Sequence, residues 1–262
     1  MALSWSQRRK LTYIGILSIL PLFLIGTVLY RYVTRPPSCF DGRQNGLERG
    51  VDCGGGCQRV CSQDVSNLIL RWQRAFYVDD DVYNLVAYIE NQNTNVGVRE
   101  IPFEFRVLDQ ANQIIGEPYV NFAYVGPNEG TAIFIPAFEV CAQQPAQVVF
   151  RFLRNPIWEK TDPKFAAPQL VVKNRVLSNE TVRPKLVAEV ENITFDDFSD
   201  VPVVALVFDA DGNAMAASQS YIEFIGDGDR KEVTFTWPLP FERSVARVEV
   251  LPRINPFEPK RF

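Results

Sequence analysis

The chain has 262 residues, of which 47% are hydrophobic and 22% charged, so wholesale disorder and collagen-like repeats are excluded. The sequence contains no histidine, which excludes histidine-based catalytic triads and histidine metal ligands. The net charge of −4 argues against nucleic acid as a partner. These values allow one or two globular domains and point to no enzyme class.

The first feature along the chain is an uncharged apolar run, Leu11–Tyr30. Twenty helical residues span about 30 Å, the thickness of a bilayer hydrocarbon core, and transmembrane helices tolerate a proline such as Pro21. We predict a signal anchor over residues 11–33 that lies in the lipid bilayer. The ten residues before it end in three basic side chains, which favours a cytoplasmic amino terminus over residues 1–10.

A cleaved signal peptide and a lipoprotein anchor both fit this segment less well than a signal anchor does. A cleaved signal peptide has a shorter apolar core and a small-residue cleavage site, which residues 30–35 do not offer. A lipoprotein needs small and apolar residues before its first cysteine, whereas Arg-Pro-Pro-Ser precedes Cys39. We therefore expect the chain after residue 33 to lie outside the cytoplasmic membrane.

Residues 34–63 form a short segment that is dense in cysteine and has few apolar residues to bury. Small segments without a core need covalent or metal staples, and an exported compartment favours disulfides. Four cysteines allow three pairings, and the sequence does not choose among them. Zinc is the less favoured staple because the spacing does not form two close pairs. The candidate disulfide cysteines are Cys39, Cys53, Cys57 and Cys61.

Oxygen-bearing side chains recur through this segment at spacings of three to four residues. Calcium takes six to eight oxygen ligands, so these side chains are candidates for a calcium site. The competing interpretation is that the Asp-Gly and Asn-Gly pairs only mark tight turns. The candidate calcium ligands are Asp41, Asn45, Glu48 and Asp52.

The segment resembles the motif Cys-x-Asp-Gly-x-x-Asn-Gly-x-Glu-x-x-Val-Asp-Cys-Gly-Gly-x-Cys of exported bacterial surface proteins. The match runs from Cys39 to Cys57 and covers about 25 residues of the chain with its flanks. The resemblance implies an exported, disulfide-rich element near the membrane end of a surface protein. It implies no activity.

The rest of the chain repeats itself at an offset of about one hundred residues. Leu85–Asn91 matches Leu186–Asn192, and Val125-Gly126 matches Ile225-Gly226. Matched stretches that occur in the same order in both halves predict two similar domains. We place the first domain at residues 64–158, a linker at 159–165, the second domain at 166–257 and a tail at 258–262.

Both copies show the period of two that is typical of half-buried strands, for example at Phe103, Phe105 and Val107. Turn signals separate these runs, and Asp209–Asn213 is predicted as a hairpin turn because no glutamate completes a calcium loop. About ninety residues of short strands predict an immunoglobulin-like β-sandwich in each copy. The predicted fold is therefore all-β, with two tandem sandwiches behind one transmembrane helix. Cys141 has no partner within its copy and is expected to be a buried core thiol.

The pattern Val-Ala-x-Val-x-Asn, followed by Val-x-Asp-x-x-Gly-Asn, Gly-x-Gly and a late Phe-Thr-Trp-Pro, resembles FxLyD-type and related immunoglobulin-like modules of bacterial envelope proteins. With its anchor and cysteine motif, the whole chain resembles membrane-anchored exported proteins of candidate-phylum bacteria. This resemblance implies fold and location only.

No nucleophile elbow and no phosphate-binding loop occur in the sequence, so we expect a non-enzymatic protein. The favoured hypothesis is a single-pass envelope protein that presents two β-sandwiches to an envelope protein partner for binding or assembly, through exposed strand edges. The alternative is a module that binds glycan or peptide through loops at the domain ends. Asn192-Ile-Thr194 is also an acceptor sequon for a glycosylating host.

Overall fold

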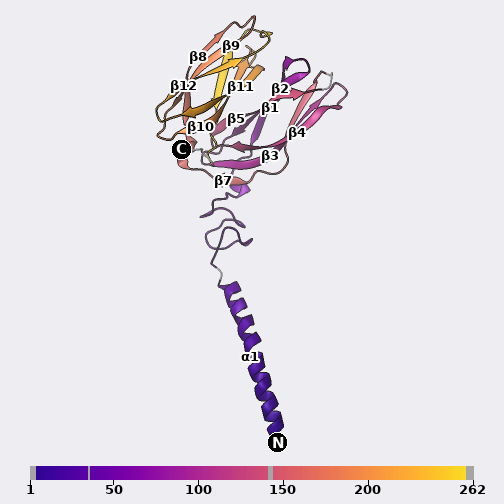
Figure 1. The fold of residues 1–262 in the computed structure, drawn as a ribbon, viewed down its shortest axis with the longest axis vertical. Coiled ribbons are helices and arrows are strands. Elements are labelled where there is room, and N and C mark those ends of the chain that lie inside the picture. The colour runs from indigo at the N-terminus through magenta and orange to yellow at the C-terminus, as the bar shows by residue number, and fades with distance from the viewer. Residues whose placement is uncertain (1–3, 35, 141–143, 258–262) are drawn as a thin grey trace. The chain divides into compact units, whose positions relative to one another are not determined.

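The computed structural model describes residues 4–34, 36–140 and 144–257 (Figure 1). The chain divides into two compact units, residues 1–56 and residues 57–262. Both predicted β domains fall within the second unit. The prediction for Cys141 and the predicted tail at 258–262 lie outside the described residues.

The first unit begins with helix α1, Trp5–Val33. The helix starts before the predicted span because Ser4 and Gln7 form a capping box, in which each side chain bonds the backbone of the other residue. Pro21 lies inside the helix without ending it. Within the described residues, α1 is the one helix that is long and apolar enough to cross a membrane.

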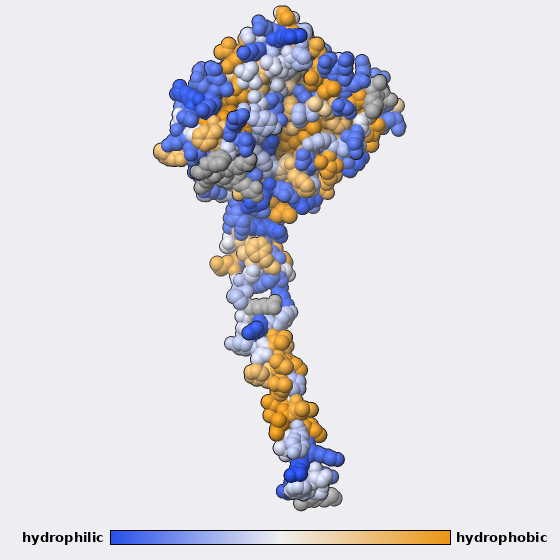
Figure 2. All heavy atoms as spheres, viewed as in Figure 1, coloured by the Kyte–Doolittle hydropathy of each residue, from blue (hydrophilic) through white to orange (hydrophobic). Residues whose placement is uncertain are grey.

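Helix α1 buries none of its residues against the rest of the unit, and apolar side chains cover its surface (Figure 2). Its hydroxyl groups bond within the helix: Thr12, Ser18 and Thr27 each donate to a carbonyl one turn earlier. A polar group that is satisfied inside its own helix costs little to place in hydrocarbon. The helix therefore has the surface that a lipid environment requires.

The second unit is built from thirteen β-strands and two short 3₁₀ helices, counted over the described residues (Figure 1). All strand pairs are antiparallel. The 3₁₀ helices are η1 (Ser62–Asp64) and η2 (Pro163–Ala166). The strands are β1 (Ile69–Asp79), β2 (Val82–Asn91), β3 (Val96–Leu108), β4 (Ile114–Val125), β5 (Glu129–Glu139), β6 (Gln147–Phe152), β7 (Trp158–Lys160), β8 (Leu170–Ser178), β9 (Lys185–Asn192), β10 (Phe198–Phe208), β11 (Ala214–Ile225), β12 (Arg230–Thr236) and β13 (Arg247–Pro252).

These strands form four sheets whose order repeats along the chain. The first copy contains β1-β2-β5 and β4-β3-β6, with β7 also paired to β3. The second copy contains β8-β9-β12 and β11-β10-β13, which is the same order of strands seven places later. The predicted β-rich body is thus confirmed, and the sequence repeat corresponds to a repeat of strand pairing.

Each copy has its own hydrophobic core, supplied by alternate residues of its two sheets. In the first copy, Leu85, Ala87 and Ile89 of β2 share a core cluster with side chains of β3, β5 and β6. In the second copy, the corresponding residues of β9, Leu186, Ala188 and Val190, share one with β10, β12 and β13. Period-two alternation in the sequence therefore marks real inward faces. Trp158 and Trp237, which lie near the end of each copy, are both buried.

A third cluster joins the two copies, and we call it the seam. It consists of the side chains by which sheet β1-β2-β5 contacts sheet β11-β10-β13. Because successive side chains point to opposite faces, β2 and β10 each serve a core with one face and the seam with the other. The seam residues are Phe76, Val86, Ala132, Val204, Leu206, Phe208, Ala214 and Ala217, with Trp72, Tyr88, Phe134 and Leu251 packed against them.

The matched runs Leu85–Asn91 and Leu186–Asn192 both end in a buried asparagine, at the end of β2 and of β9. The Asn91 side chain donates to the carbonyls of Val96 and Gly126, at 2.8 and 2.6 Å. The Asn192 side chain makes the equivalent bonds to Asp196 and Gly226. Each amide ties two loops of its copy together. Because Asn192 is only 1% exposed, its sequon is not available for glycosylation in the folded chain.

The predicted linker at residues 159–165 contains regular structure. Its first residues belong to β7, which pairs with β3, and its last residues begin η2. Residues after Cys57 add to the free side of β7, because Val60 donates to the Trp158 carbonyl and Lys160 donates to the Gln58 carbonyl, both at 2.9 Å. The end of the cysteine-rich segment is therefore paired to the first copy.

Candidate functional site

The four cysteines of the predicted staple, Cys39, Cys53, Cys57 and Cys61, are all disulfide-bonded. Cys57 and Cys61 are almost fully buried in the second unit, at 1% and 4% exposed. A disulfide sulfur is not a thiolate, so these cysteines do not supply the ligands of a zinc site. The disulfide alternative is the one the structure contains.

The four predicted calcium ligands lie close together in the first unit and bond mainly to backbone amides. The Asp52 carboxylate accepts from the amides of Asp41 and Gly42, at 3.0 and 3.1 Å. The Asn45 side chain donates to Asp41 at 2.8 Å, and the Asn45 amide donates to Glu48 at 3.0 Å. The hydrogen bond from Asn45 is the main cause that lowers the pKa of Asp41. These bonds are those of turn-forming side chains.

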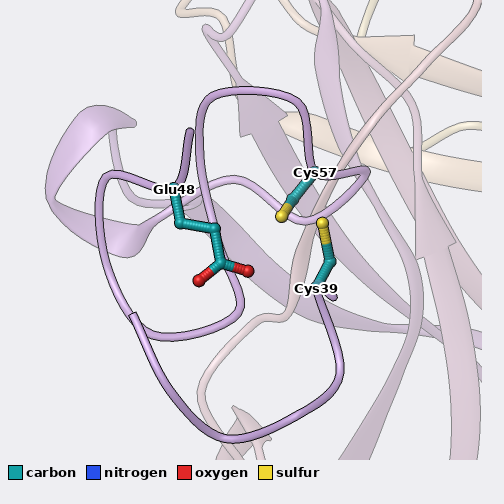
Figure 3. Close-up of side chains that lie close together, drawn as sticks. All are labelled: Cys39, Glu48 and Cys57. Atoms are coloured by element: carbon teal, nitrogen blue, oxygen red, sulfur yellow. The ribbon is translucent and has the colours of Figure 1, made fainter. Parts of the chain in front are cut away.

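The same cluster has the donor types that calcium accepts. Figure 3 shows the Glu48 carboxylate beside Cys39, with its nearest oxygen within 4.8 Å of the Cys39 sulfur; Cys57, also drawn, is a disulfide cysteine. The Asn45 side-chain oxygen is buried and accepts no hydrogen bond from the described residues. A hard cation in this cluster would be held by carboxylate and amide oxygens, without sulfur. The calcium site stays a prediction.

Glycine at position 55 is required by the fold of this segment. Gly55 has φ +56°, and a Cβ atom there would lie 1.8 Å from the Leu47 carbonyl oxygen. The neighbouring Gly56 has open space around the same position. The Gly-Gly run is thus a steric requirement at one residue and does not form a phosphate-binding loop.

Two arginines lie along the seam of the second unit, and each donates hydrogen bonds to the other copy. Arg74 of the first copy donates to the Ala214 carbonyl at 2.7 Å and to the Asn213 side chain at 3.0 Å. Arg253 of the second copy donates to the Tyr124 carbonyl at 3.1 Å and to the Ala132 carbonyl at 3.4 Å. Neither guanidinium has an ion-pair partner among the described residues. Carbonyl and amide oxygens hold both positive charges, and the Arg253 guanidinium also lies over the Tyr124 ring, 4.6 Å from its centroid.

A cavity of about 550 Å³ opens at the Arg74 end of the seam, and we call it the seam cavity. Three segments line it: the end of β1 with the start of β2, the β10–β11 turn, and residues 237–243 between β12 and β13. Pockets of this size between structural modules are the usual sites of small-ligand binding. The seam cavity is therefore the candidate site of the second unit.

One wall of the seam cavity is a turn that the sequence predicts correctly. Asp209 accepts hydrogen bonds from the amides of Asp211 and Asn213, at 3.1 and 2.8 Å, so the run is an Asx-type hairpin turn. Its second carboxylate oxygen accepts from Arg243 at 2.8 Å. The backbone bond at Asn213 and the Arg243 guanidinium outweigh the effect of burial and lower the pKa of Asp209. Asp209 is therefore a saturated structural carboxylate.

The opposite wall presents two tyrosines from neighbouring strands. Tyr77 of β1 is directly opposite Tyr83 of β2, and their rings meet edge to face at 5.4 Å. Tyr77 is 52% exposed, whereas Tyr83 is partly buried. Burial is the main cause that raises the pKa of Tyr83, and the neighbouring Tyr77 adds to it. Tyr83 is therefore a neutral hydrogen-bond donor at physiological pH.

A smaller cavity of about 420 Å³ lies at the Arg253 end of the seam. The turn around Pro127, the η2–β8 connection and the end of β13 line it, and most of its lining is apolar. The Nε atom of Arg253 is buried there without a hydrogen-bond partner among the described residues. The two cavities thus differ in character, since the seam cavity carries several polar side chains and two tyrosines.

Arg74, Tyr77 and Tyr83 are not among the site residues that the sequence predicts. The aligned copies carry a signal for the face that holds Arg74, although not for the two tyrosines. The outward face of β1 carries Trp72, Arg74 and Phe76, whereas the same positions of β8 carry Asn174, Val176 and Ser178. An aromatic face in only one copy indicates that this face is covered.

Comparisons with known proteins do not identify the chain. No protein-family model matches it, and no curated protein matches it. Among solved structures, it is similar to a red sea bream transglutaminase (9% identity, TM-score 0.24) and to a family 2 β-glucuronidase (10% identity, TM-score 0.20). The alignments cover 72% and 79% of this chain but only 29% and 25% of those chains. Likenesses at these scores carry no argument about function.

Proposed function

We propose that the chain is a single-pass envelope protein, anchored by helix α1, that presents two tandem immunoglobulin-like sandwiches outside the cytoplasmic membrane for protein binding or assembly. In this proposal, the amino terminus is cytoplasmic and the protein is not an enzyme. The observation that carries it is the combination of an unburied apolar helix with four disulfide-bonded cysteines shortly after it.

The disulfides support the proposed side of the membrane. Disulfides persist in oxidising compartments and are rare in the reducing cytosol. The cysteines begin six residues after the helix ends at Val33, so the helix and the oxidising compartment are close along the chain. The basic side chains at the start of the helix, ahead of its apolar run, favour the same orientation.

The strand edges support a binding role. Strands β4 and β8 each pair with one neighbouring strand only in the described sheets. Most of β8 is exposed, and Val176 in its second half is 63% exposed. An edge that is not covered offers unpaired backbone groups to a partner strand. No motif for catalysis accompanies these edges in the sequence.

A reporter that is active only outside the cytoplasm tests the orientation. We expect a phosphatase fused after Phe262 to be active and the protein to stay in the membrane fraction after alkaline carbonate extraction. An inactive reporter would contradict the proposed orientation, and release by carbonate would contradict the anchor. Free-thiol labelling of the exported chain should leave Cys39, Cys53, Cys57 and Cys61 unlabelled until the protein is reduced.

Cross-linking in native membranes tests the binding role. We expect a photoreactive residue placed at Val176 on the β8 edge to capture a defined envelope protein. The matched control is the same residue at Val187, which lies on a face of neighbouring strand β9. Equal yields at both positions, or no captured protein at either, would contradict binding through the β8 edge.

A further inference from the structure

We propose that the seam cavity binds a neutral oligosaccharide, with Tyr77 as the platform for one sugar ring. This proposal goes beyond the display function above, because it assigns a ligand class to a site that the edge-binding proposal does not use. It rests on the balance of charge in the cavity, on its exposed aromatic side chain and on the rigidity of its walls.

The charges that line the seam cavity cancel. Arg74 and Arg243 contribute two positive charges, and Asp209 and Glu242 contribute two negative charges. The Asp209 charge is already satisfied by Arg243 and two backbone amides. Such a lining has no net charge that would attract an anionic or a cationic ligand. A neutral ligand can still hydrogen-bond to both its positive and its negative side chains.

The polar groups that stay accessible include both donors and acceptors. The Arg243 side chain is 62% exposed although one of its nitrogens bonds Asp209, so it presents further N–H groups to the cavity mouth. Glu242 is exposed on the same loop and supplies carboxylate oxygens. A sugar hydroxyl donates one hydrogen bond and accepts others, and this mixed set matches it.

The aromatic group that supplies the apolar part of the recognition is Tyr77, an exposed ring whose position is set by edge-to-face contact with Tyr83. On the other side, Trp237 and Phe241 meet edge to face at 5.2 Å and pack into the second core, so they give that wall its rigidity. A pyranose ring has one face of C–H groups that packs on an exposed aromatic ring while its hydroxyls reach polar side chains at the edge. A lipid chain would leave those polar side chains unpaired.

The cavity walls are fixed before a ligand arrives. Arg74 ties the first wall to the β10–β11 turn across the seam. The loop of residues 237–243 is tied back by bonds from the Trp237 amide to the Pro184 carbonyl and from the Phe241 amide to the Glu180 carbonyl, at 3.0 and 3.1 Å. Pro238 and Pro240 restrict the loop further. Binding therefore costs little ordering of the protein.

The test is a calorimetric titration of the full chain in detergent micelles with hexa-N-acetylchitohexaose, a neutral oligosaccharide that is called chitohexaose below. An oligogalacturonate and a proline-rich decapeptide serve as the acidic and peptide probes. We expect chitohexaose to bind, and Tyr77→Ala to weaken the binding about tenfold through loss of the ring contact. The matched control is Tyr221→Ala on β11, which removes an equally exposed tyrosine, 62%, outside the cavity lining and should change affinity less than about twofold.

A second variant, Glu242→Gln, keeps the shape of the exposed side chain and removes its charge. We expect it to weaken chitohexaose binding severalfold without making the acidic probe the preferred ligand. Failure of chitohexaose to bind, or equal affinity in wild type and Tyr77→Ala, would overturn the proposal. Tighter binding of the peptide with the same Tyr77 dependence would assign the cavity to a peptide instead. The photo-cross-linking at β8 is independent of all these outcomes.

Discussion

Strands β3 and β10 occupy the same place in the two repeated copies, yet their outward faces differ completely. In β10, the outward residues Val204 and Leu206 are fully buried in the seam. In β3, the counterparts are Glu104 and Arg106, which face away from the core. The inward faces of both strands stay apolar. The two copies are thus alike in what lies inside each of them and differ where they meet.

The charged face of β3 is organised as an ion cluster. Glu104 accepts from Arg106 on its own strand and from Arg151 on β6, and the Arg151 Nε lies 2.6 Å from a carboxylate oxygen. Burial opposes ionisation of Glu104, but the two arginines outweigh burial and lower the pKa of Glu104. On β13, the position of Arg151 is taken by Leu251 of the seam. A carboxylate with two arginines thus stands where the second copy has three apolar side chains.

The same contrast separates β2 from β9. Outward residues Val86 and Tyr88 of β2 lie in the seam, whereas β9 carries Val187 and Glu189 at these positions. The seam joins two different faces, that of sheet β1-β2-β5 and that of sheet β11-β10-β13. A further copy that packed in the same way would therefore have to contact the outer face of β4-β3-β6 or of β8-β9-β12. The charges on the free faces oppose this addition, because a buried unmatched charge is costly.

The most damaging substitution places the residue type of β3 position 106 at the equivalent seam position, 206 of β10. Leu206→Arg buries a guanidinium among Phe208, Val86 and Ala132 without an acidic partner, so we expect a loss of about 4 kcal/mol or more in the free energy of unfolding. The measurement is the urea midpoint of the full chain in detergent. The reciprocal control, Arg106→Leu, should change stability by less than about 1 kcal/mol. Equal losses in both variants would contradict the assignment of the seam.

A second substitution exchanges an aromatic seam residue for its counterpart. Trp72 stacks on Tyr88 at 5.6 Å and meets Phe208 edge to face at 6.4 Å. We expect Trp72→Asn to cost about 2–4 kcal/mol, because it removes a large side chain and leaves a polar one in the seam. Asn174→Ala, at the same position of exposed strand β8, should stay within about 0.5 kcal/mol. A thermal or urea titration of both variants distinguishes the two environments.

The third prediction concerns a position at which the copies agree. Asn91 and Asn192 each hold two carbonyls with one buried amide, so Asn91→Ala and Asn192→Ala should each cost about 1–3 kcal/mol. The double variant should lose the sum of the two, since the residues serve different loops. A cost at only one of the two positions would show that the repeat has not kept this role in both copies.

Much of the fold follows from the sequence because strong local patterns carry it. The apolar run predicts α1, alternation predicts the strands, and the Asp209–Asn213 run predicts a turn. The seam could not be predicted in this way, because the side chains at 204 and 206 of β10 look like those of any buried strand. Which face meets the other copy is a property of tertiary packing. The seam cavity could not be predicted from local patterns either, because its walls come from segments that are distant in the sequence.

The smallest predicted effect is a difference in the pH dependence of stability between two equivalent turns, one in each copy. Asp109 and Asp209 both accept two backbone amides, but only Asp209 also accepts from an arginine, Arg243, among the described residues. The pKa of Asp209 is lowered, first by the backbone bond at Asn213 and then by Arg243. Its stabilising contribution is therefore complete above the ordinary aspartate pKa of about 3.9 and is lost as the pH falls through the lower folded value.

We expect Asp209→Asn to lower the urea midpoint at pH 7 more than Asp109→Asn does, because the asparagine cannot pair with Arg243. The difference between wild type and Asp209→Asn should begin to shrink below about pH 4, where the carboxylate of the unfolded chain takes up a proton. It should be smallest once the pH has fallen through the lower pKa of the folded chain. Urea titrations of the three chains between pH 7 and pH 2.5 measure this difference. A constant difference across that range would show that the ion pair with Arg243 contributes nothing, and that Asp209 acts only through the shape of its turn.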